Sequence, residues 1–396
     1  MAAMPLVLRT EPYYKAFREK HLRCGSAHPP VMAEQFMWLK TDVSSRRAHI
    51  LREEDRGEAD NVSFACPLVL PRRPGPFRQV VIILHGLNES EYRKYFPWAC
   101  TLASAGMPVL LFPLAFLVNR RPRRWRDDAA TQAQLRSRQA LSGNEVATRY
   151  NVILSERLQD HPERLFLGGQ QSYFDLLDVV ESIRQGVFSI DNRDAETLVP
   201  QRPFAEATQV DFLGFSIGGY LTLGLLLEEQ HNPVLMDSRG IIFAAAAPWT
   251  HADATVNTNP LSPFILDRLA TERLHAFYRS VEADALLDNT QGHWCRAIFR
   301  AERDVLEAPL ARIRRRLLTI GNAADTVIPA AGMAVTFGDL DCLLSLGAHE
   351  YPFSVADVWQ AGVNRNIAKS YNVHPAYEAG FQQFMQSVIE FLERHG

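Results

Sequence analysis

The stretch VDFLGFSIGGYLTL, residues 210–223, constrains the fold more than any other part of this sequence. It begins as an apolar run and then places Ser216 between Gly214 and Gly218, directly before a second apolar segment. A G-x-S-x-G pentapeptide between a strand and a helix is typical of a sharp turn that holds a nucleophilic serine. Glycines there let strand and helix approach closely. The same glycines would suit a purely structural turn, so a nucleophile needs further partners elsewhere in the chain.

Strands and helices alternate along the chain. Apolar runs without polar alternation are typical of buried parallel strands, and such runs alternating with helices predict a mostly parallel sheet covered on both faces. The predicted strands are residues 62–71, 79–86, 107–116, 209–216, 239–248, 315–321 and 340–347. The predicted helices are residues 92–106, 144–159, 171–186, 217–230 and 378–395.

Composition and charge exclude several classes of function. The chain has 396 residues, of which 47% are hydrophobic and 22% charged, as in ordinary globular proteins. Its net charge of −3 does not favour nucleic acid as a partner. The 5 cysteines show no C-x-x-C spacing, which argues against a disulfide framework and a zinc site.

The sequence also lacks the patterns that mark targeting, membranes or cofactors. We find no secretory signal and no apolar segment long enough to span a bilayer, so we expect a cytoplasmic protein without membrane insertion. There is no H-E-x-x-H motif, and Ser216 interrupts the G-x-G-x-x-G spacing of a dinucleotide loop. We therefore expect no metal and no cofactor.

A nucleophilic serine needs a base and an acid that orients the base. In strand–turn–helix enzymes of this kind the order along the chain is Ser, Asp or Glu, then His. Asp325 follows the predicted strand at 315–321, and His349 follows the last predicted strand. Both lie where parallel strands end at their carboxyl edge, beside Ser216. We favour these two residues as the acid and the base.

Other residues of the same types remain as alternatives. Among the histidines, His374 precedes the terminal helix and is the more serious rival, and Asp253 is the main rival acid because it also follows a strand. Glu350 is badly placed to orient its own neighbour. The further alternatives are His251, His275, His293 and Asp304.

Two backbone amides must stabilise the negative oxygen that forms when serine attacks a carbonyl. The residue after the nucleophile, Ile217, supplies one of them in this type of turn. Leu87, in the loop after the strand at 79–86, is the expected second donor, with Asn88 as the alternative. We interpret His85 as a structural residue of that loop.

The motifs ILHGLNE, GFSIGG, GNAADTVIP and GAHEYPF together resemble the α/β-hydrolase superfamily of esterases and lipases. The segments HGLNESEYRKYFPWA and FPLAFLVNRRP are also similar to a bacterial group within it that has no assigned reaction. The resemblance implies a mostly parallel sheet of about eight strands flanked by helices. It also implies a Ser216–His349–Asp325 triad and no cofactor.

These patterns suggest a division of the chain. Residues 1–75 form an N-terminal extension with one or two strands that join the sheet, and residues 76–249 and 313–396 form the α/β-hydrolase core. An extra helical insertion occupies about 113–208, and residues 250–312 form a helical lid. The sequence leaves open whether the insertion covers the site, forms a homodimer interface or does neither.

Several side chains are candidates for binding substrate. The run NRRPRRWRDD includes Arg120 and Arg121 close to a strand end, where a guanidinium would clamp a carboxylate or phosphate; pairing with the adjacent aspartates is the alternative. Asn88, Phe215 and Trp249 lie close to the motifs. Aromatic residues of the lid either line a pocket or pack the lid onto the core: Phe264, Phe277, Tyr278, Trp294 and Phe299.

The sequence thus predicts a serine hydrolase that cleaves a small-molecule carboxylic ester through an acyl-enzyme. An acyltransferase or thioesterase would use the same residues. A non-catalytic ligand-binding protein is the alternative from a different class, and an intact triad argues against it.

Overall fold

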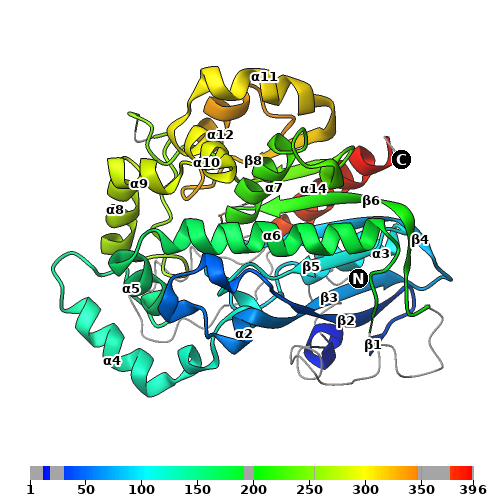
Figure 1. The fold of residues 1–396 in the computed structure, drawn as a ribbon, viewed down its shortest axis with the longest axis horizontal. Helices are drawn as coiled ribbons and strands as arrows, with labels where there is room; N and C mark the ends of the chain where they lie inside the picture. Colours follow the sequence, from blue (N-terminus) through cyan, green and yellow to red (C-terminus); the bar gives the residue numbers. More distant parts are fainter. Residues whose placement is uncertain are drawn as a thin grey trace.

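A computed structural model describes residues 12–17, 31–190, 200–253, 255–346, 349 and 375–394. Its centre is a nine-stranded sheet with the order β1-β2-β3-β5-β4-β6-β7-β8-β9 (Figure 1). The strands are β1 (Val31–Met32), β2 (Phe36–Ser44), β3 (Ser63–Pro71), β4 (Phe77–Leu84), β5 (Val109–Phe112), β6 (Phe204–Phe215), β7 (Gly240–Phe243), β8 (Leu317–Asn322) and β9 (Cys342–Leu344).

Helices connect these strands and cover the sheet. The α-helices are α2 (Ala59–Val62), α3 (Phe96–Ser104), α4 (Asp128–Gln139), α5 (Val152–Asp160), α6 (Arg164–Arg184), α7 (Ile217–Leu227), α8 (Arg268–Phe277), α9 (Val281–Leu286), α10 (Thr290–Arg300), α11 (Arg303–Ile313), α12 (Ala330–Phe337) and α14 (Pro375–Glu393). Short 3-10 helices are η1 (Ala48–Ile50), η2 (Glu53–Asp55), η3 (Val118–Arg120), η4 (Arg123–Arg126), η5 (Pro233–Leu235) and η6 (Arg314–Arg316).

The strand directions confirm the expected mostly parallel sheet. All neighbours from β5 to β9 pair in parallel, whereas β3 is antiparallel to both β2 and β5. The two-residue β1 adds a ninth strand at the edge, one more than expected. Residues 1–75 contribute three strands to the sheet, β1, β2 and β3, where one or two were expected. This arrangement, with a strand–turn–helix at Ser216 after the central β6, is that of the α/β-hydrolase fold.

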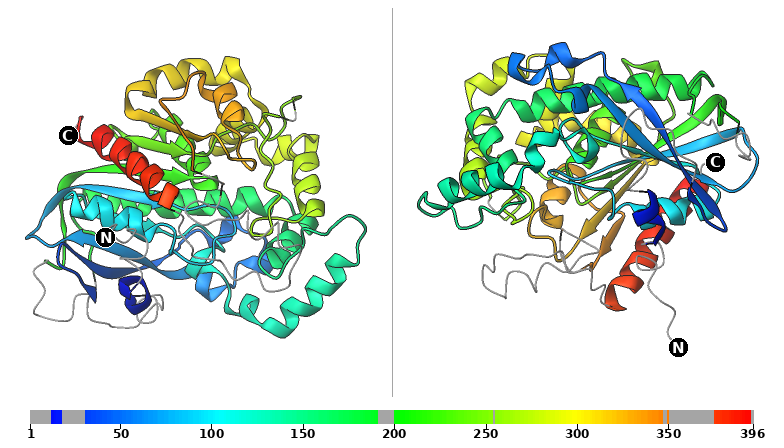
Figure 2. Two further views of the ribbon diagram at one scale, coloured as in Figure 1. Left: turned by 180° about the vertical axis from the view of Figure 1, so that it is seen from behind. Right: turned by 90° about the horizontal axis from the view of Figure 1, so that it is seen from below.

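Helices lie on both faces of the sheet, which explains its apolar strands. Figure 1 shows α6 and α7 on one face, and Figure 2 shows α3 and α14 on the other. Val80–Leu84 in β4 are at most 1% exposed. On the far face, Trp98 of α3 packs against Phe384 of α14, with ring centroids 5.0 Å apart. None of the helices in the described part of the chain is both long and apolar enough to cross a membrane.

The insertion between β5 and β6 divides into two parts. Helix α6 packs along the sheet, whereas α4 and α5 extend beyond its edge (Figure 1). There α5 contacts α8 of the 250–312 segment. Arg138 of α4 forms a buried ion pair with Asp267, the N-cap of α8, at 2.5 Å between Nε and Oδ2. The insertion and the 250–312 segment are therefore tied together, and the lid role of that segment stays a prediction.

Candidate active site

Ser216 lies in a sharp turn between β6 and α7. Its backbone has φ 53° and ψ −124°, a region that side-chain-bearing residues rarely occupy. Two backbone hydrogen bonds hold the turn: the Ser216 N–H donates to the Phe243 carbonyl at 3.1 Å, and the Gly219 N–H donates to the Ser216 carbonyl at 2.8 Å. A strained serine conformation at this place in the fold is the one expected of a nucleophile turn.

The glycines on either side of Ser216 are required by close packing. A Cβ on Gly218 would lie 2.3 Å from the carbonyl oxygen of Leu84 in β4. A Cβ on Gly214 would lie 2.3 Å from Thr222 Oγ1 in α7. Strand and helix therefore meet at a distance that only glycine permits, which confirms the physical reason for the pentapeptide.

Gly218→Ala and Gly224→Ala are expected to change stability in opposite directions, although both lie in α7. Gly218→Ala drives a methyl group into backbone and should lower the free energy of unfolding by about 1–3 kcal/mol. Gly224 has nothing within 4 Å of its Cβ position, so Gly224→Ala should raise that energy by about 0.5–1 kcal/mol. Chemical denaturation of the two variants measures this, and a stable Gly218→Ala protein would contradict the close packing.

The structure brings Asp325 and His349 together. Asp325 Oδ2 lies 2.7 Å from His349 Nδ1, and both side chains are almost completely buried. The other carboxylate oxygen accepts hydrogen bonds from the backbone N–H groups of Val327 and Ile328, at 2.8 Å each. The carboxylate is thus fixed at both oxygens, and it holds the His349 ring with Nε2 as the nitrogen left to exchange a proton.

The His349 ring lies beside the serine turn. It stacks on Phe215, the residue before Ser216, with ring centroids 4.9 Å apart and an angle of 29° between planes. Among the residues that the structure describes, no hydrogen bond joins Ser216 and His349. Catalytic hydrogen bonds are often long or misaligned before substrate binds. The rival His374 and Glu350 lie outside the described residues.

Asn322, at the end of β8, connects the loops of the acid and the base. Its side-chain oxygen accepts the N–H of Leu346 at 3.1 Å, and its backbone carbonyl accepts the N–H of Asp325 at 3.1 Å. One residue therefore fixes the start of both loops. Sequence reasoning missed this role, because an asparagine at a strand end gives no signal of which loop it will hold.

The loop after β4 is fixed by His85. Its Nε2 accepts the N–H of Leu114 at 2.9 Å, and its Nδ1 lies 2.9 Å from the carbonyl of Gly86. Burial lowers the pKa of His85 to about 4, so the ring is neutral at pH 7 and Nδ1 carries the proton. His85 has the structural role that we expected for it.

His85 is expected to make the protein lose stability in acid. An unfolded histidine has its ordinary pKa of 6.5. Between pH 6.5 and about 4, His85 is therefore protonated in the unfolded chain but neutral in the folded chain. The free energy of unfolding therefore falls as pH falls through this window, by about 3 kcal/mol from this group. Denaturation at several pH values should show a smaller loss for His85→Gln. If the free energy of unfolding changes with pH in the same way in the wild type and in His85→Gln, the loss of stability in acid does not come from His85.

A buried polar cluster supports the same loop. The Gly86 N–H donates to the Tyr95 hydroxyl at 2.8 Å, and that hydroxyl donates to Glu89 Oε1 at 3.0 Å. Lys94 forms an ion pair with the same Glu89 oxygen at 2.6 Å. The loop backbone is thereby held in one conformation, so that the Leu87 amide between these anchors has a fixed position.

The two expected oxyanion donors border one cavity between α6 and α7, named here the apolar cavity. Leu87 and Ile217 both line it, and within the described residues neither of their N–H groups donates to an acceptor. Ile217 is also the first residue of α7, where the helix dipole favours negative charge. These amides are therefore available to an oxygen of a bound molecule.

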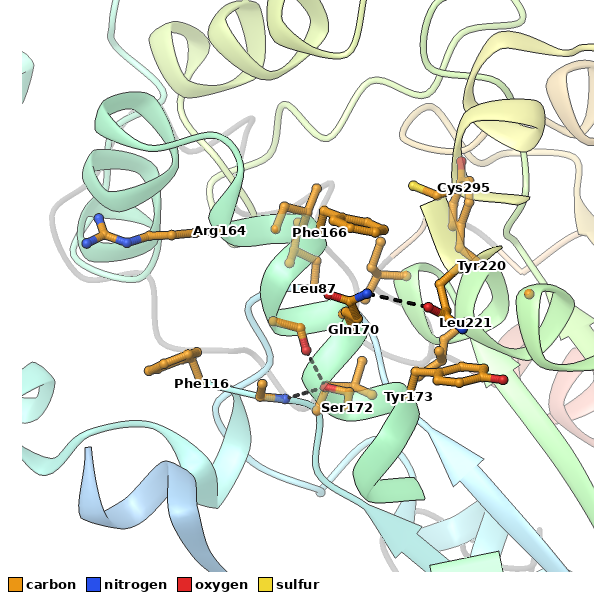
Figure 3. Close-up of a pocket in the computed structure, with 18 of the residues that line it drawn as sticks. Leu87, Phe116, Arg164, Phe166, Gln170, Ser172, Tyr173, Tyr220, Leu221 and Cys295 are labelled. Carbon is orange, nitrogen blue, oxygen red and sulfur yellow. Dashed lines mark hydrogen bonds between the residues drawn. The ribbon is translucent and has the colours of Figure 1, made fainter. Parts of the chain in front are cut away.

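Leu87 borders two cavities, one mainly apolar and one polar. The apolar cavity lies between α6 and α7, and Figure 3 shows Phe166 and Gln170 facing Tyr220 and Leu221 across it. Its lining includes Leu87, Leu114, Phe166, Ile217, Leu221 and Ile298. The polar cavity is lined by His349 and Phe215 together with Glu89, Lys94, Arg121, Arg149 and Tyr150. The loop that carries the Leu87 amide therefore borders both cavities.

Cys295 also borders the apolar cavity, but it is a poor candidate nucleophile. Burial raises the pKa of its thiol to about 12, so the thiol stays protonated at neutral pH. Among the described residues, no three His, Cys, Asp or Glu side chains are grouped so that they could ligate one metal ion.

The structure corrects two of the expected substrate contacts. Arg120 is 0% exposed and donates to Asn61 and to Asp175 Oδ2, the latter at 2.8 Å, so it reaches neither cavity. Trp249 is also buried. It stacks on Phe299 at 4.5 Å and donates to the Tyr220 hydroxyl, and neither cavity includes it. Both side chains are structural.

The other expected contacts lie at the cavities. Arg121 and Phe215 line the polar cavity. Asn88 also borders it, but its side-chain amide faces the carbonyls of Tyr150, Phe264 and Ile265 at 2.8–3.2 Å. Asn88 thus joins the loop after β4 to the insertion and to the 250–312 segment.

The aromatic residues of that segment divide between the cavities and the core. The apolar cavity includes Tyr278, Trp294 and Phe299, and the polar cavity includes Phe264. Phe277 packs in the core and lines neither. The rival residues lie elsewhere: His251 and Asp253 in the loop after β7, His275 in α8, His293 in α10 and Asp304 in α11.

Sequence reasoning missed a group of polar residues at the apolar cavity. Glu228, Tyr173 and Gln291 line it, from the end of α7, from α6 and from α10. One signal was present in the sequence, because Glu228 lies on the same face of α7 as Ile217 and Leu221 at helical spacing. The sequence did not indicate that α6 and α10 would pack against that face.

Comparisons with known proteins give a family and distant structural relatives. The model of a family of unknown function, DUF6051, matches residues 39–392. A comparison with curated proteins gives no match.

Two of the similar solved structures are esterases. Brefeldin A esterase, described as a bacterial homologue of human hormone-sensitive lipase, is 12% identical with a TM-score of 0.47, and the match covers 98% of this chain and 85% of that one. One of two fungal esterases from Rhizomucor miehei is 12% identical with a TM-score of 0.45, over 100% of this chain and 93% of that one. The family match spans most of the sequence, and the chain belongs to the DUF6051 family.

Proposed function

We propose that this protein is a serine hydrolase that cleaves a carboxylic ester through an acyl-enzyme. The observation that carries the proposal is the buried hydrogen bond between Asp325 and His349, whose ring lies against the serine turn. A base oriented by a carboxylate next to a strained serine is the arrangement that activates a hydroxyl as a nucleophile. The available amides of Leu87 and Ile217 add the donors that such a reaction needs.

The proposed reaction has two halves. Ser216 Oγ attacks the ester carbonyl while His349 Nε2 takes the hydroxyl proton, and Asp325 stabilises the charged ring. The Leu87 and Ile217 amides bind the negative oxygen of the tetrahedral intermediate. When the intermediate collapses, His349 gives the proton to the departing alcohol and the acyl group stays on Ser216. Water then attacks the acyl-enzyme, with His349 as base, and releases the acid.

The cavities suggest how a substrate would lie. The apolar cavity suits the acyl group, because its lining next to the oxyanion donors is mainly apolar, and the polar cavity next to His349 suits the alcohol. Tyr278, Trp294 and Phe299 of the 250–312 segment contribute to the apolar cavity. We therefore propose that this segment, together with the insertion, acts as the lid of the site.

Chemical labelling tests the proposal directly. The wild-type protein is treated with a fluorophosphonate probe, and peptide mass spectrometry locates the adduct, which we expect on Ser216. The protein should also hydrolyse p-nitrophenyl esters, and a series from acetate to long chains measures the acyl preference. Added alcohol or thiol acceptors distinguish hydrolysis from acyl transfer. A folded protein that neither reacts with the probe nor turns over any ester would contradict the proposal.

A further inference from the structure

The apolar cavity follows one face of α7 along its length. Ile217, Tyr220, Leu221 and Gly224 line it at the spacing of a single helix face, and Glu228 follows the last helical residue on that face. The rise of a helix places Gly224 roughly 10 Å and Glu228 roughly 16 Å beyond Ile217. The cavity that the Ile217 amide borders therefore continues for about three turns of the helix.

Gly224 leaves this face of α7 open after two turns. Among the described residues, nothing lies within 4 Å of the position that a Cβ on Gly224 would take, whereas a Cβ on Gly219 would lie 2.3 Å from the Ala245 Cβ. Close packing therefore requires a glycine at 219 but not at 224. Helices α6 and α10 pack against α7, and Gly224 lines the cavity together with Tyr220 and Leu221. We therefore assign the open space beside Gly224 to the cavity.

The opposite wall of the cavity has the same feature. Gly169 of α6 lines the cavity, and nothing in the described part of the chain lies within 4 Å of its Cβ position either. Leu165 and Tyr173, which lie on the same face of α6, also line the cavity, and Figure 3 shows α6 facing α7 across it. A glycine inside a helix is destabilising relative to alanine. Two helices thus each present a residue without a side chain to one cavity, and close packing explains neither.

The polar side chains along this part of the cavity bond to partners in the protein. The Tyr173 hydroxyl donates to Glu228 Oε2 at 3.2 Å, and Gln170 Nε2 donates to Gln291 Oε1 at 3.4 Å. The Tyr220 hydroxyl donates to a backbone carbonyl. Because these groups have partners already, the space between α6 and α7 suits a hydrocarbon chain rather than a polar one.

We propose that the acyl group of the substrate is a long unbranched hydrocarbon chain that follows α7 and passes Gly224; this rests on the ester hydrolysis proposed above. A chain whose carbonyl oxygen is bound by the Ile217 amide reaches Gly224 at about the length of an octanoyl group. It reaches the end of this face at about the length of a dodecanoyl group. Gly224 is then a residue that determines specificity, because a side chain there would close the cavity to the longer chains.

The chain-length preference of the wild-type protein is the first test. Turnover of p-nitrophenyl butyrate, octanoate and dodecanoate is measured at concentrations below those at which the esters form micelles. Each methylene group that the cavity buries should raise kcat/KM by roughly a factor of four. Even if only a few of the additional methylene groups are buried, kcat/KM for the dodecanoate should exceed that for the butyrate by about tenfold or more. A protein that prefers the butyrate would overturn the inference.

Variants at Gly224 test where the chain lies. Gly224→Leu places a branched side chain in the path of the chain, so it should lower the ratio of kcat/KM for dodecanoate to that for butyrate by about tenfold or more. Gly224→Ala should lower this ratio less. Circular dichroism verifies the fold, and Gly169→Leu on the opposite wall takes the place of Gly224→Leu if the latter does not fold. An unchanged ratio in the folded variant would overturn the inference.

Gly57→Leu is the matched control. Gly57 lies in an exposed turn and borders neither cavity, and no atom of the described residues lies within 4 Å of its Cβ position. It should therefore keep the chain-length ratio of the wild type. A drop in Gly57→Leu as large as that in Gly224→Leu would mean that the ratio does not report on the cavity, and would also overturn the inference.

The two proposals fail separately. Fluorophosphonate labelling of Ser216 and turnover of any ester report on the hydrolase proposal alone. A labelled, active protein that prefers short acyl chains would leave the hydrolase proposal standing and remove the inference about its substrate.

Discussion

Ser216→Ala is expected to lower kcat for an ester substrate by about six orders of magnitude. The variant keeps the turn, the Leu87 and Ile217 amides and both cavities, but it has no hydroxyl to attack the carbonyl. Alanine tolerates the Ser216 backbone conformation no worse than serine does, so the midpoint of thermal unfolding should change little. Steady-state turnover of a p-nitrophenyl ester, measured beside the unfolding midpoint, separates loss of chemistry from loss of fold.

A double variant tests whether Ser216 and His349 act as one unit. His349→Ala alone should lower kcat nearly as much as Ser216→Ala does. The double variant should lower kcat only a little further, because the effects of substitutions within one catalytic unit are strongly non-additive. His251→Ala is the control, since His251 lies in the loop after β7 and hydrogen-bonds the Asp253 N–H. If the kcat of the double variant is lowered by the product of the two single-variant factors, the two residues act independently.

Local sequence patterns were sufficient for the core of the fold and for the serine turn. Residues Val80–Leu84 of the buried β4 form a continuous apolar run, and the spacing of Gly214 and Gly218 follows from contacts among β6, α7 and the neighbouring β4. The positions of Asp325 and His349 followed from strand ends, because all parallel strands deliver their carboxyl ends to one edge of the sheet.

Features that depend on distant partners were not predictable. The Arg120 side chain was expected at the site because it follows a strand end. It is instead buried against Asn61 and Asp175, each more than fifty residues away in the sequence. The Arg120 charge is paired inside the protein, and the sequence around Arg120 does not indicate these distant partners.

Glu228 is the converse case. In the sequence it begins the polar run Glu228-Glu229-Gln230, which is typical of a helix end in solvent. Its neighbour Glu229 does pair with Arg316, partly exposed, whereas Glu228 is buried because α6 and α10 close over it. Helical spacing gave the face of α7 but not the helices that cover that face.

Asp325→Asn is expected to lower kcat by about four orders of magnitude while leaving the fold intact. The asparagine oxygen can still accept the N–H groups of Val327 and Ile328, which hold the loop. Its NH2 group then faces His349 Nδ1, where the carboxylate stood. Two donors cannot share that contact, so the proton of the ring moves to Nε2. The base then presents an N–H to Ser216 and cannot accept the hydroxyl proton at neutral pH.

The controls for this variant are the rival acids. Asp253 is exposed and bonds only to Thr255 and to His251 among the described residues, and Asp304 is exposed in the first turn of α11. Asp253→Asn and Asp304→Asn should therefore keep wild-type kcat. Turnover of a p-nitrophenyl ester, measured for each of the three variants, is the readout. A large loss in Asp253→Asn with an active Asp325→Asn would move the acid to the loop after β7.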